Sequence, residues 1–158
     1  MRVSIITISD SVSTGDREDG SGKALAQRCR DMGWELIATS VVPDEESRIR
    51  TQLLALADAR KSDLILTTGG TGLGPRDVTP EATASVANRL VPGLAERMRQ
   101  VGAGKNPNAA LSRSIAAIRG TTLIVNLPGS PRGAVESLDA IAELLPHAVS
   151  VLHGARHD

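Results

Sequence analysis

The chain has 158 residues, and its 18 Lys and Arg balance its 18 Asp and Glu. This length fits one domain, and the balanced charge gives no electrostatic basis for binding nucleic acid or an anionic membrane. The chain has no Phe and no Tyr, and Trp34 is its single Trp. This lack of aromatic side chains disfavours stacking on single-stranded bases. No stretch approaches the roughly 20 apolar residues that span a bilayer, and Cys29, an apolar filler of a helix face, has no second cysteine to pair with. We therefore expect a cytoplasmic protein.

The first third of the chain predicts a strand, a loop, a helix and a second strand. Residues 2–8 run apolar, as a buried strand does, and the polar segment 9–22 predicts a long loop. Ser21 is positioned to cap the helix that follows, and Gly33 ends it. Residues 34–42 predict the second strand.

The middle of the chain repeats this alternation. A proline breaks the second strand, and Asp44 is positioned to cap a helix whose apolar face runs from Ile49 to Ala57. Residues 62–68 predict the third strand, which leads directly into a glycine-rich loop. Thr79 is positioned to cap the next helix, because a proline follows it at the first helical position.

The last third is less regular. The Pro92-Gly93 pair interrupts the preceding helix, which resumes over residues 94–101. Segment 111–118 is consistent with either a helix or a short strand. Residues 121–126 predict the fourth strand, which ends in a tight loop. A long helix follows, with an apolar face running from Val135 to Leu145.

Because strands alternate with helices, the sequence predicts an α/β fold of three layers, with a mostly parallel sheet and helices on both of its faces. We expect one domain over residues 1–154 and a tail over residues 155–158. In such sheets ligands bind beyond the carboxyl ends of the strands. Four loops leave those ends, and each contains residues able to bind a phosphate or a metal: Ser9–Gly22, Pro43–Asp44, Gly69–Pro80 and Asn126–Pro131.

Four glycines within six residues follow the third strand, in Gly69-Gly70-Thr71-Gly72-Leu73-Gly74. Glycine lets the backbone approach a ligand closely, and several inward N–H groups form an anion-binding nest. The loop matches neither the P-loop nor the dinucleotide-binding pattern. A simple turn needs one glycine rather than four, so we expect a phosphate-binding loop.

Two aspartates flank this predicted anion site. Asp77 lies just before a helix start, where a carboxylate repels a phosphate unless it binds Mg²⁺ or a polar donor of the substrate. The alternative for Asp77 is a contact with nearby loop N–H groups. Asp44 has the same two interpretations, a magnesium ligand or a plain helix cap. Arg76 either pairs with a phosphate or is solvated.

The first and last of these loops add polar groups. Asp10 and Asp19 lie in the first loop, and Ser21-Gly22 closes it at a helix start that suits a phosphate; the alternative is a capping serine with solvated aspartates. Asn126, at the end of the fourth strand, can both donate and accept, as recognition of a heterocycle edge requires.

Histidines and nucleophiles give no further site. His147, His153 and His157 do not have the spacing of a zinc motif, and solvated or packed histidines are the expected interpretation. No nucleophile motif is present, so covalent catalysis is not indicated.

These loops together resemble the Mog/MoaB family of molybdenum cofactor biosynthesis, which includes the G domain of gephyrin and its plant relatives. The most specific match joins the glycine loop to Arg76-Asp77-Val78-Thr79-Pro80-Glu81. The resemblance extends over essentially the whole chain. Its other motifs are Ile8-Ser9-Asp10-Ser11-Val12-Ser13, Asp19-Gly20-Ser21-Gly22, Val42-Pro43-Asp44-Glu45, Leu111-Ser112-Arg113 and Asn126-Leu127-Pro128-Gly129-Ser130-Pro131.

The resemblance implies a molybdopterin-binding fold, a homotrimer, and transfer of an adenylyl group from ATP to molybdopterin with Mg²⁺, releasing pyrophosphate. It implies that Asp44 and Asp77 are the acidic residues on which transfer depends and that they hold the magnesium ion. Residues on the nucleotide side are Asp10, Asp19, Ser21 and Gly22. Residues on the pterin side are Gly69, Gly70, Thr71, Gly72, Ser112, Asn126, Pro128, Gly129 and Ser130.

Two alternatives to the adenylyltransferase stay open at this point. The first is a trimer of the MoaB type that holds molybdopterin without chemistry, and the second is a scaffold protein. Segment 130–133 is nearer to MoaB-type loops, whereas 42–45 and 111–114 are nearer to the gephyrin type. The motifs therefore do not separate the subgroups.

Overall fold

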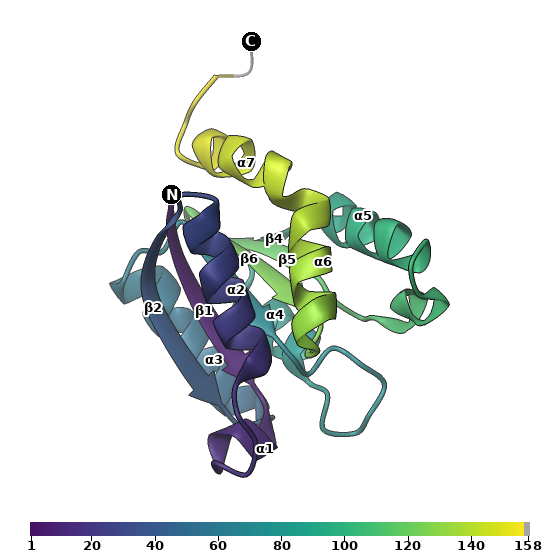
Figure 1. Ribbon diagram of the computed structural model, residues 1–158. Coiled ribbons are helices and arrows are strands. Elements are labelled where there is room, and N and C mark those ends of the chain that lie inside the picture. The colour runs from purple at the N-terminus through teal and green to yellow at the C-terminus, as the bar shows by residue number, and fades with distance from the viewer. Residues whose placement is uncertain (157–158) are drawn as a thin grey trace.

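The computed structural model describes residues 1–156 (Figure 1). Within this range six strands form a single sheet in the order β2-β1-β3-β6-β5-β4. The first four in that order run parallel, whereas β5 is antiparallel to both β6 and β4. The strands are β1 (Arg2–Ile8), β2 (Glu35–Val42), β3 (Leu64–Thr68), β4 (Arg89–Leu90), β5 (Ala116–Arg119) and β6 (Thr122–Leu127).

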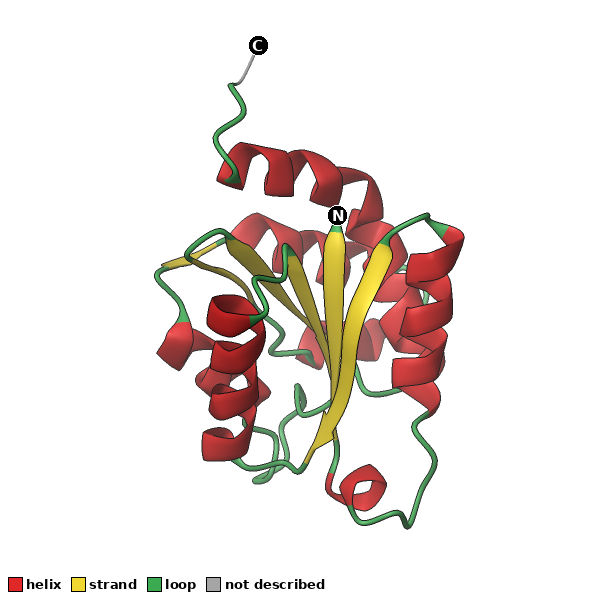
Figure 2. Ribbon diagram, turned by 90° about the vertical axis from the view of Figure 1, so that its left-hand side faces the viewer, coloured by secondary structure: helices red, strands yellow, loops and turns green. Residues whose placement is uncertain are grey.

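Helices cover both faces of the sheet (Figure 2), which confirms the predicted three-layer α/β fold. The α-helices are α1 (Asp10–Ser13), α2 (Gly20–Asp31), α3 (Glu46–Leu54), α4 (Thr79–Val86), α5 (Pro92–Ala103), α6 (Pro131–Ile141) and α7 (Leu145–Leu152). A π-helical turn, Ala55–Ala59, extends α3, and 3₁₀ turns form at Pro107–Leu111 and Ala142–Leu144. No helix within residues 1–156 is long and apolar enough to cross a bilayer.

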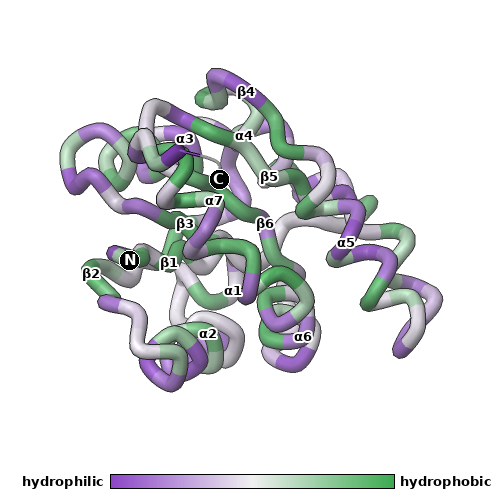
Figure 3. Tube along the Cα trace, turned by 90° about the horizontal axis from the view of Figure 1, so that it is seen from above, coloured by the Kyte–Doolittle hydropathy of each residue, from purple (hydrophilic) through white to green (hydrophobic). Residues whose placement is uncertain are grey.

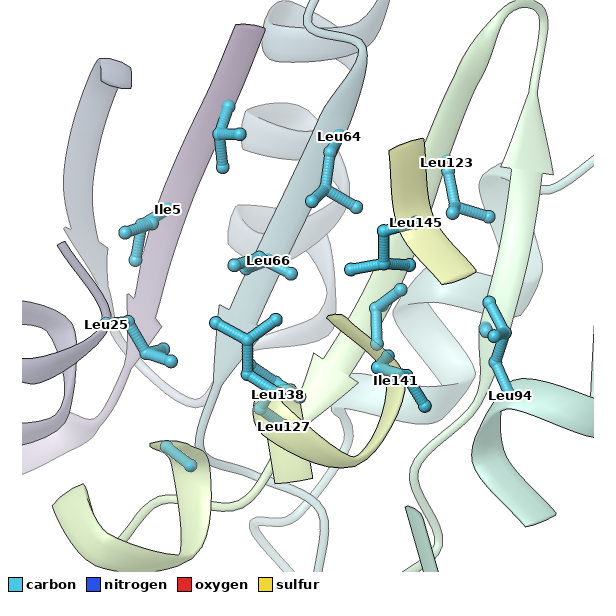
Figure 4. Packing of buried hydrophobic residues seen from close by; sticks show 14 of the residues in the cluster. Ile5, Leu25, Leu64, Leu66, Leu94, Leu123, Leu127, Leu138, Ile141 and Leu145 are labelled. Atoms are coloured by element: carbon cyan, nitrogen blue, oxygen red, sulfur yellow. The ribbon is translucent and has the colours of Figure 1, made fainter. Parts of the chain in front are cut away.

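The alternation of side chains along each central strand builds two cores. In β1, Val3 and Ile5 face the larger cluster, formed with α2, α5, α6 and α7 (Figure 4), while Ile6 and Ile8 face the smaller cluster, formed with α3 and α4. Both faces are covered, so the strand is almost continuously apolar. Figure 3 shows that the central strands are mainly hydrophobic, whereas the helices alternate between hydrophobic and hydrophilic residues. Cys29 lies in the larger core, as expected.

The structure decides one open alternative and corrects other details of the predicted elements. Segment 111–118, left open between a helix and a short strand, contains the short strand β5, which pairs with the unpredicted two-residue strand β4. Helix α5 begins at Pro92 itself, because a proline is well tolerated in a first turn. The long final helix is broken at Ala142–Leu144 into α6 and α7, and both helices pack into the larger core. His157 and Asp158, which end the tail predicted over residues 155–158, lie outside the described residues.

Candidate active site

The carboxyl ends of the four parallel strands meet at one edge of the sheet, as the sequence predicts (Figure 2). Two backbone hydrogen bonds tie neighbouring strand ends together. The Ser9 N–H donates to the Val42 carbonyl over 3.0 Å, and the Gly69 N–H donates to the Leu127 carbonyl over 3.1 Å. The loops that leave this edge therefore start from one rigid platform.

The glycine loop begins with a turn that needs two glycines. Gly69 and Gly70 have positive φ values of 104° and 68°, a region that favours glycine. A Cβ atom at Gly69 would collide with the Ile8 carbonyl oxygen, and one at Gly70 would collide with the Thr79 hydroxyl. Thr79 fixes the turn, because its hydroxyl donates to the Gly69 carbonyl over 2.9 Å and its N–H to the Gly70 carbonyl over 3.1 Å.

Thr79 is thus an anchor of the glycine turn, and the prediction that it caps a helix is wrong. The capping position of α4 belongs to Val78, which makes no side-chain capping bond. The hydroxyl of Thr79 is committed to the turn instead, and the residue is completely buried.

Asp10 and Asp44 are joined by two reciprocal hydrogen bonds. The Asp10 N–H donates to the Asp44 carboxylate, and the Asp44 N–H donates to the Asp10 carboxylate, both over 2.9 Å. Arg76 donates to both oxygens of Asp10 over 3.0 Å. Asp44 therefore does not cap α3, whose capping position is Glu45. The plain-cap alternative for Asp44 is wrong, whereas the side chain of Arg76 is 60% exposed and pairs with Asp10.

The electrostatics differ between these two carboxylates. The guanidinium of Arg76, together with the Asp44 N–H, lowers the pKa of Asp10 below its ordinary value. Burial raises the pKa of Asp44; the Asp10 N–H opposes this shift, and the negative charges of Asp10 and Asp77 add to it. Asp44 is therefore a partly buried carboxylate in an acidic surrounding, and a cation there would relieve the repulsion.

Asp19 caps α2, so the prediction that Ser21 is the cap is wrong. The Asp19 carboxylate accepts from the Gly22 N–H and from the Thr7 hydroxyl, both over 2.8 Å. A Cβ atom at Gly22 would collide with the Asp19 carboxylate and with the Thr7 hydroxyl. Ser21 is 5% exposed and its hydroxyl is not needed as the cap.

Two cavities open at this edge and meet at Ser130. The first, which we call the acidic cavity, has a volume of about 510 Å³, and the second, the wide cavity, about 770 Å³. The predicted site residues that line the acidic cavity are Asp19, Ser21, Asp44, Gly69, Gly70, Asp77, Gly129 and Ser130. Those that line the wide cavity are Thr71, Gly72, Ser112, Pro128 and Ser130.

Three predicted residues line neither of these cavities. Asp10 acts through its bonds to Asp44, and Gly22 through its contact with Asp19. Asn126 is fully buried beneath the strand ends, where its amide donates to the hydroxyls of Thr67 over 3.0 Å and Thr83 over 2.9 Å. Its side chain supports the platform from below.

The comparisons with known proteins agree with this geometry. Residues 4–147 match the family described as a probable molybdopterin binding domain. The chain belongs to this family. It is 40% identical to the molybdopterin adenylyltransferase of Escherichia coli over 157 residues, which cover 98% of this chain and 79% of that protein. It is 37% identical to the molybdopterin adenylyltransferase of Helicobacter pylori over 156 residues, covering 98% and 89%.

Solved structures of the molybdopterin-binding family share the fold. The molybdopterin biosynthesis enzyme MoaB from Thermus thermophilus superposes with a TM-score of 0.92 at 51% identity, covering 99% of both chains. The molybdopterin biosynthesis Mog protein from Mycobacterium ulcerans superposes with a TM-score of 0.89 at 37% identity, covering 96% of this chain and 98% of that one. The resemblance drawn from the loop motifs is confirmed.

Within residues 1–156 no three His, Cys, Asp or Glu side chains converge into a ready-made metal site. A magnesium ion is usually held by one or two carboxylates together with substrate phosphates and water. Asp44 and Asp77 fit that role by position, because both line the acidic cavity and the charge of Asp77 raises the pKa of Asp44. The alternative for Asp77, a contact with a loop N–H group, is also observed, because one of its carboxylate oxygens accepts from the Gly74 N–H over 2.9 Å. His147 lies on α7 and His153 follows it, away from both cavities.

Sequence reasoning gave no structural role to Arg113, which touches the loop that carries Asp77. Its side chain bonds the Gly72 carbonyl, the Asp77 carbonyl and the Glu81 carboxylate. These partners lie 32 to 41 residues away, and two of them are backbone carbonyls. No pattern in the sequence reports such a contact.

Proposed function

We propose that this chain is a molybdopterin adenylyltransferase of molybdenum cofactor biosynthesis. The terminal phosphate of molybdopterin attacks the α-phosphorus of ATP; a new P–O bond forms, the bond to the β-phosphate breaks, and pyrophosphate leaves. The observation that carries the proposal is the convergence of Asp44 and Asp77 on one cavity beside the glycine turn. The 40% identical relative in Escherichia coli, which bears the name of this activity, supports it.

Two adjoining cavities suit a reaction with two substrates. The acidic cavity takes the nucleotide phosphates, and the wide cavity takes the pterin. Gly69, Gly70 and Gly129, which the resemblance implies for the pterin side, line the acidic cavity and so lie on the nucleotide side in this proposal. They meet at Ser130, which therefore lies where the two phosphates react. Holding both reactants at one junction replaces an encounter in solution by a reaction within one complex, which can supply a large part of the rate enhancement.

The reaction needs charge neutralisation more than a base. The attacking phosphate oxygen is already ionised, so no side chain must remove a proton. Two anions must nevertheless approach each other, and the backbone N–H groups of the glycine loop stabilise the phosphate charge there. Mg²⁺, held by Asp44 and Asp77, supplies neutralisation of the nucleotide phosphates when bound.

Supporting residues keep the two carboxylates in place. Asp10 fixes the backbone of Asp44 by the reciprocal hydrogen bonds, and Arg76 fixes Asp10. Asp19 orders the first turn of α2, whose N-terminus faces the acidic cavity. Asn126 holds the strand ends together from below.

The test is incubation of the protein with molybdopterin and Mg-ATP, with pyrophosphate and the AMP adduct measured directly. We expect Asp44→Asn and Asp77→Asn each to lower kcat by at least about 10²-fold, while molybdopterin still binds. Asp58→Asn is the matched control, because Asp58 pairs with Arg119 far from both cavities. The control should retain wild-type turnover.

A result in which wild-type protein binds molybdopterin but forms no adduct at any Mg²⁺ concentration would overturn the proposal and favour a pterin-holding protein. The homotrimer that the resemblance implies and the cytoplasmic location expected from the composition belong to the same proposal. Sedimentation equilibrium tests the first, and fractionation of the source cell tests the second.

A further inference from the structure

We propose that Arg113 is a positioning residue of the adenylyl transfer, because its guanidinium clamps the two limbs of the loop that carries Asp77. This inference rests on the proposed function for its kinetic part. It gives a role to a residue that lines neither cavity but bonds the backbone of Gly72 and Asp77, which do.

The clamp joins both limbs of the loop. Nε of Arg113 donates to the Gly72 carbonyl over 2.8 Å, on the outgoing limb, and Nη2 donates to the Asp77 carbonyl over 2.7 Å, on the returning limb. The backbone N–H of Arg113 donates to the Thr71 carbonyl over 2.9 Å. One residue therefore fixes the loop opening at three points.

A carboxylate orients the clamp. Nη1 of Arg113 donates to both oxygens of Glu81 over 2.7 and 3.1 Å, so all three guanidinium nitrogens are used. Glu81 lies in the first turn of α4, directly after the loop. The guanidinium is half-buried, with 37% of the side chain exposed. The planar guanidinium serves three acceptors in fixed directions, whereas a lysine ammonium is a single point charge that cannot reproduce that fork.

At the loop tip, Arg76 also donates to the Asp10 carboxylate and so ties the tip to the first loop. Asp77 and Gly74 bond each other, through the Asp77 N–H to the Gly74 carbonyl over 3.0 Å and the Gly74 N–H to the Asp77 carboxylate over 2.9 Å. The residues between them are exposed. A Cβ atom at Gly72 or Gly74 would stand 2.9 Å from the same carboxylate oxygen, so the loop already fits closely around it. A shift of either limb would therefore turn the Asp77 carboxylate away from the acidic cavity.

The kinetic consequence follows from geometry. A catalytic group misplaced by about 1 Å lowers the rate by about 10²-fold. We therefore expect Arg113→Ala and Arg113→Lys to lower kcat by about 10²-fold, with a change in KM for molybdopterin of less than about threefold, because both variants keep the backbone bond to Thr71 and lose only the side-chain bond to Gly72 in the lining of the wide cavity. Guanidinium ion, added well below denaturing concentrations, should restore part of the kcat of Arg113→Ala and none of that of Arg113→Lys.

Arg119→Ala is the matched control. Arg119 also bonds both oxygens of a carboxylate, that of Asp58 over 2.9 and 2.8 Å, and a backbone carbonyl, that of Val86 over 3.0 Å. It lies at the opposite end of β5. Loss of stability alone would affect both variants, whereas loss of loop position affects only Arg113.

A second readout does not depend on turnover. Hydrogen exchange of the backbone amides of residues 71–78 should be faster in both Arg113 variants than in wild type and Arg119→Ala, and guanidinium ion should slow it in Arg113→Ala. If Arg113→Lys keeps wild-type kcat and wild-type exchange, the clamp is overturned. If wild-type protein forms no adduct, the proposed function fails, and the exchange rates alone decide whether the clamp exists.

Discussion

Gly69→Ala should be the most damaging single-methyl substitution in the glycine loop. Gly69 combines a positive φ of 104° with a close approach to the Ile8 carbonyl oxygen. That oxygen belongs to the backbone at the end of β1, which is paired on both sides within the sheet. The end of β1 is held by the bond from the Ser9 N–H to the Val42 carbonyl, and Gly69 is held by the bond from its N–H to the Leu127 carbonyl, so neither can move aside without breaking a bond. The new methyl group therefore meets a partner that cannot yield.

The magnitude has two parts. An alanine held in this backbone region costs about 1–3 kcal/mol. Forcing a methyl group into a rigid, filled space costs about 1–3 kcal/mol more. We expect a loss of about 4 kcal/mol in the free energy of unfolding, which is a large share of the roughly 5–15 kcal/mol that stabilises a typical domain.

Gly15 and Gly33 provide matched controls, because each has a positive φ and no atom within 4 Å of an added Cβ. Gly15→Ala and Gly33→Ala should therefore lose only the backbone part, about 1 kcal/mol. Urea unfolding followed by circular dichroism measures all three variants. If Gly69→Ala loses no more than the two controls, the collision with the Ile8 carbonyl is not real and the turn is looser than described.

Two further predictions follow from the pKa shifts. The acid limb of the pH profile of kcat/KM should report ionisation of Asp44 and lie above the ordinary range of an aspartate, with activity rising as the pH increases through it, because burial raises that pKa. Asp10→Asn removes one of the neighbouring negative charges, so the limb should move to lower pH; an unchanged limb would assign it to another group. Burial also raises the pKa of Cys29 to about 11, so iodoacetamide should modify the native protein only as fast as it unfolds, and rapid labelling would contradict the packing of that thiol.

The sheet and the location of the site could be predicted from the sequence, because both rest on local signals. The strand β3 begins with three apolar residues and leads directly into a loop with four glycines, which is a pattern contained in about ten residues. The short strands β4 and β5 could not be separated from a helix, because two and four residues are too few to show a period.

The capping residues were wrong for a different reason. Ser21 and Thr79 are side chains that cap helices when nothing else competes for them. Here Asp19 takes the capping position of α2, and the Thr79 hydroxyl bonds the glycine turn ten residues earlier in the chain. Tertiary partners decide between equivalent local interactions, and a sequence pattern does not contain those partners.

The placement of two arginines explains how this site tolerates the negative charge of its carboxylates. Asp44 and Asp77 must converge for the proposed chemistry, yet each additional carboxylate raises the free energy of ionising Asp44. The fold offsets this by attaching each carboxylate-bearing loop to an arginine outside the cavities: Arg76 through Asp10, and Arg113 through the Asp77 carbonyl.

Neither arginine bonds the side chain of Asp44 or Asp77 directly. These two carboxylates therefore keep oxygens available to a cation. An arginine bonded directly to those carboxylates would stabilise the apo protein better and occupy the positions that the metal needs. The proposed site must first concentrate negative charge and then bind a cation together with phosphates. Indirect attachment of the arginines meets both requirements.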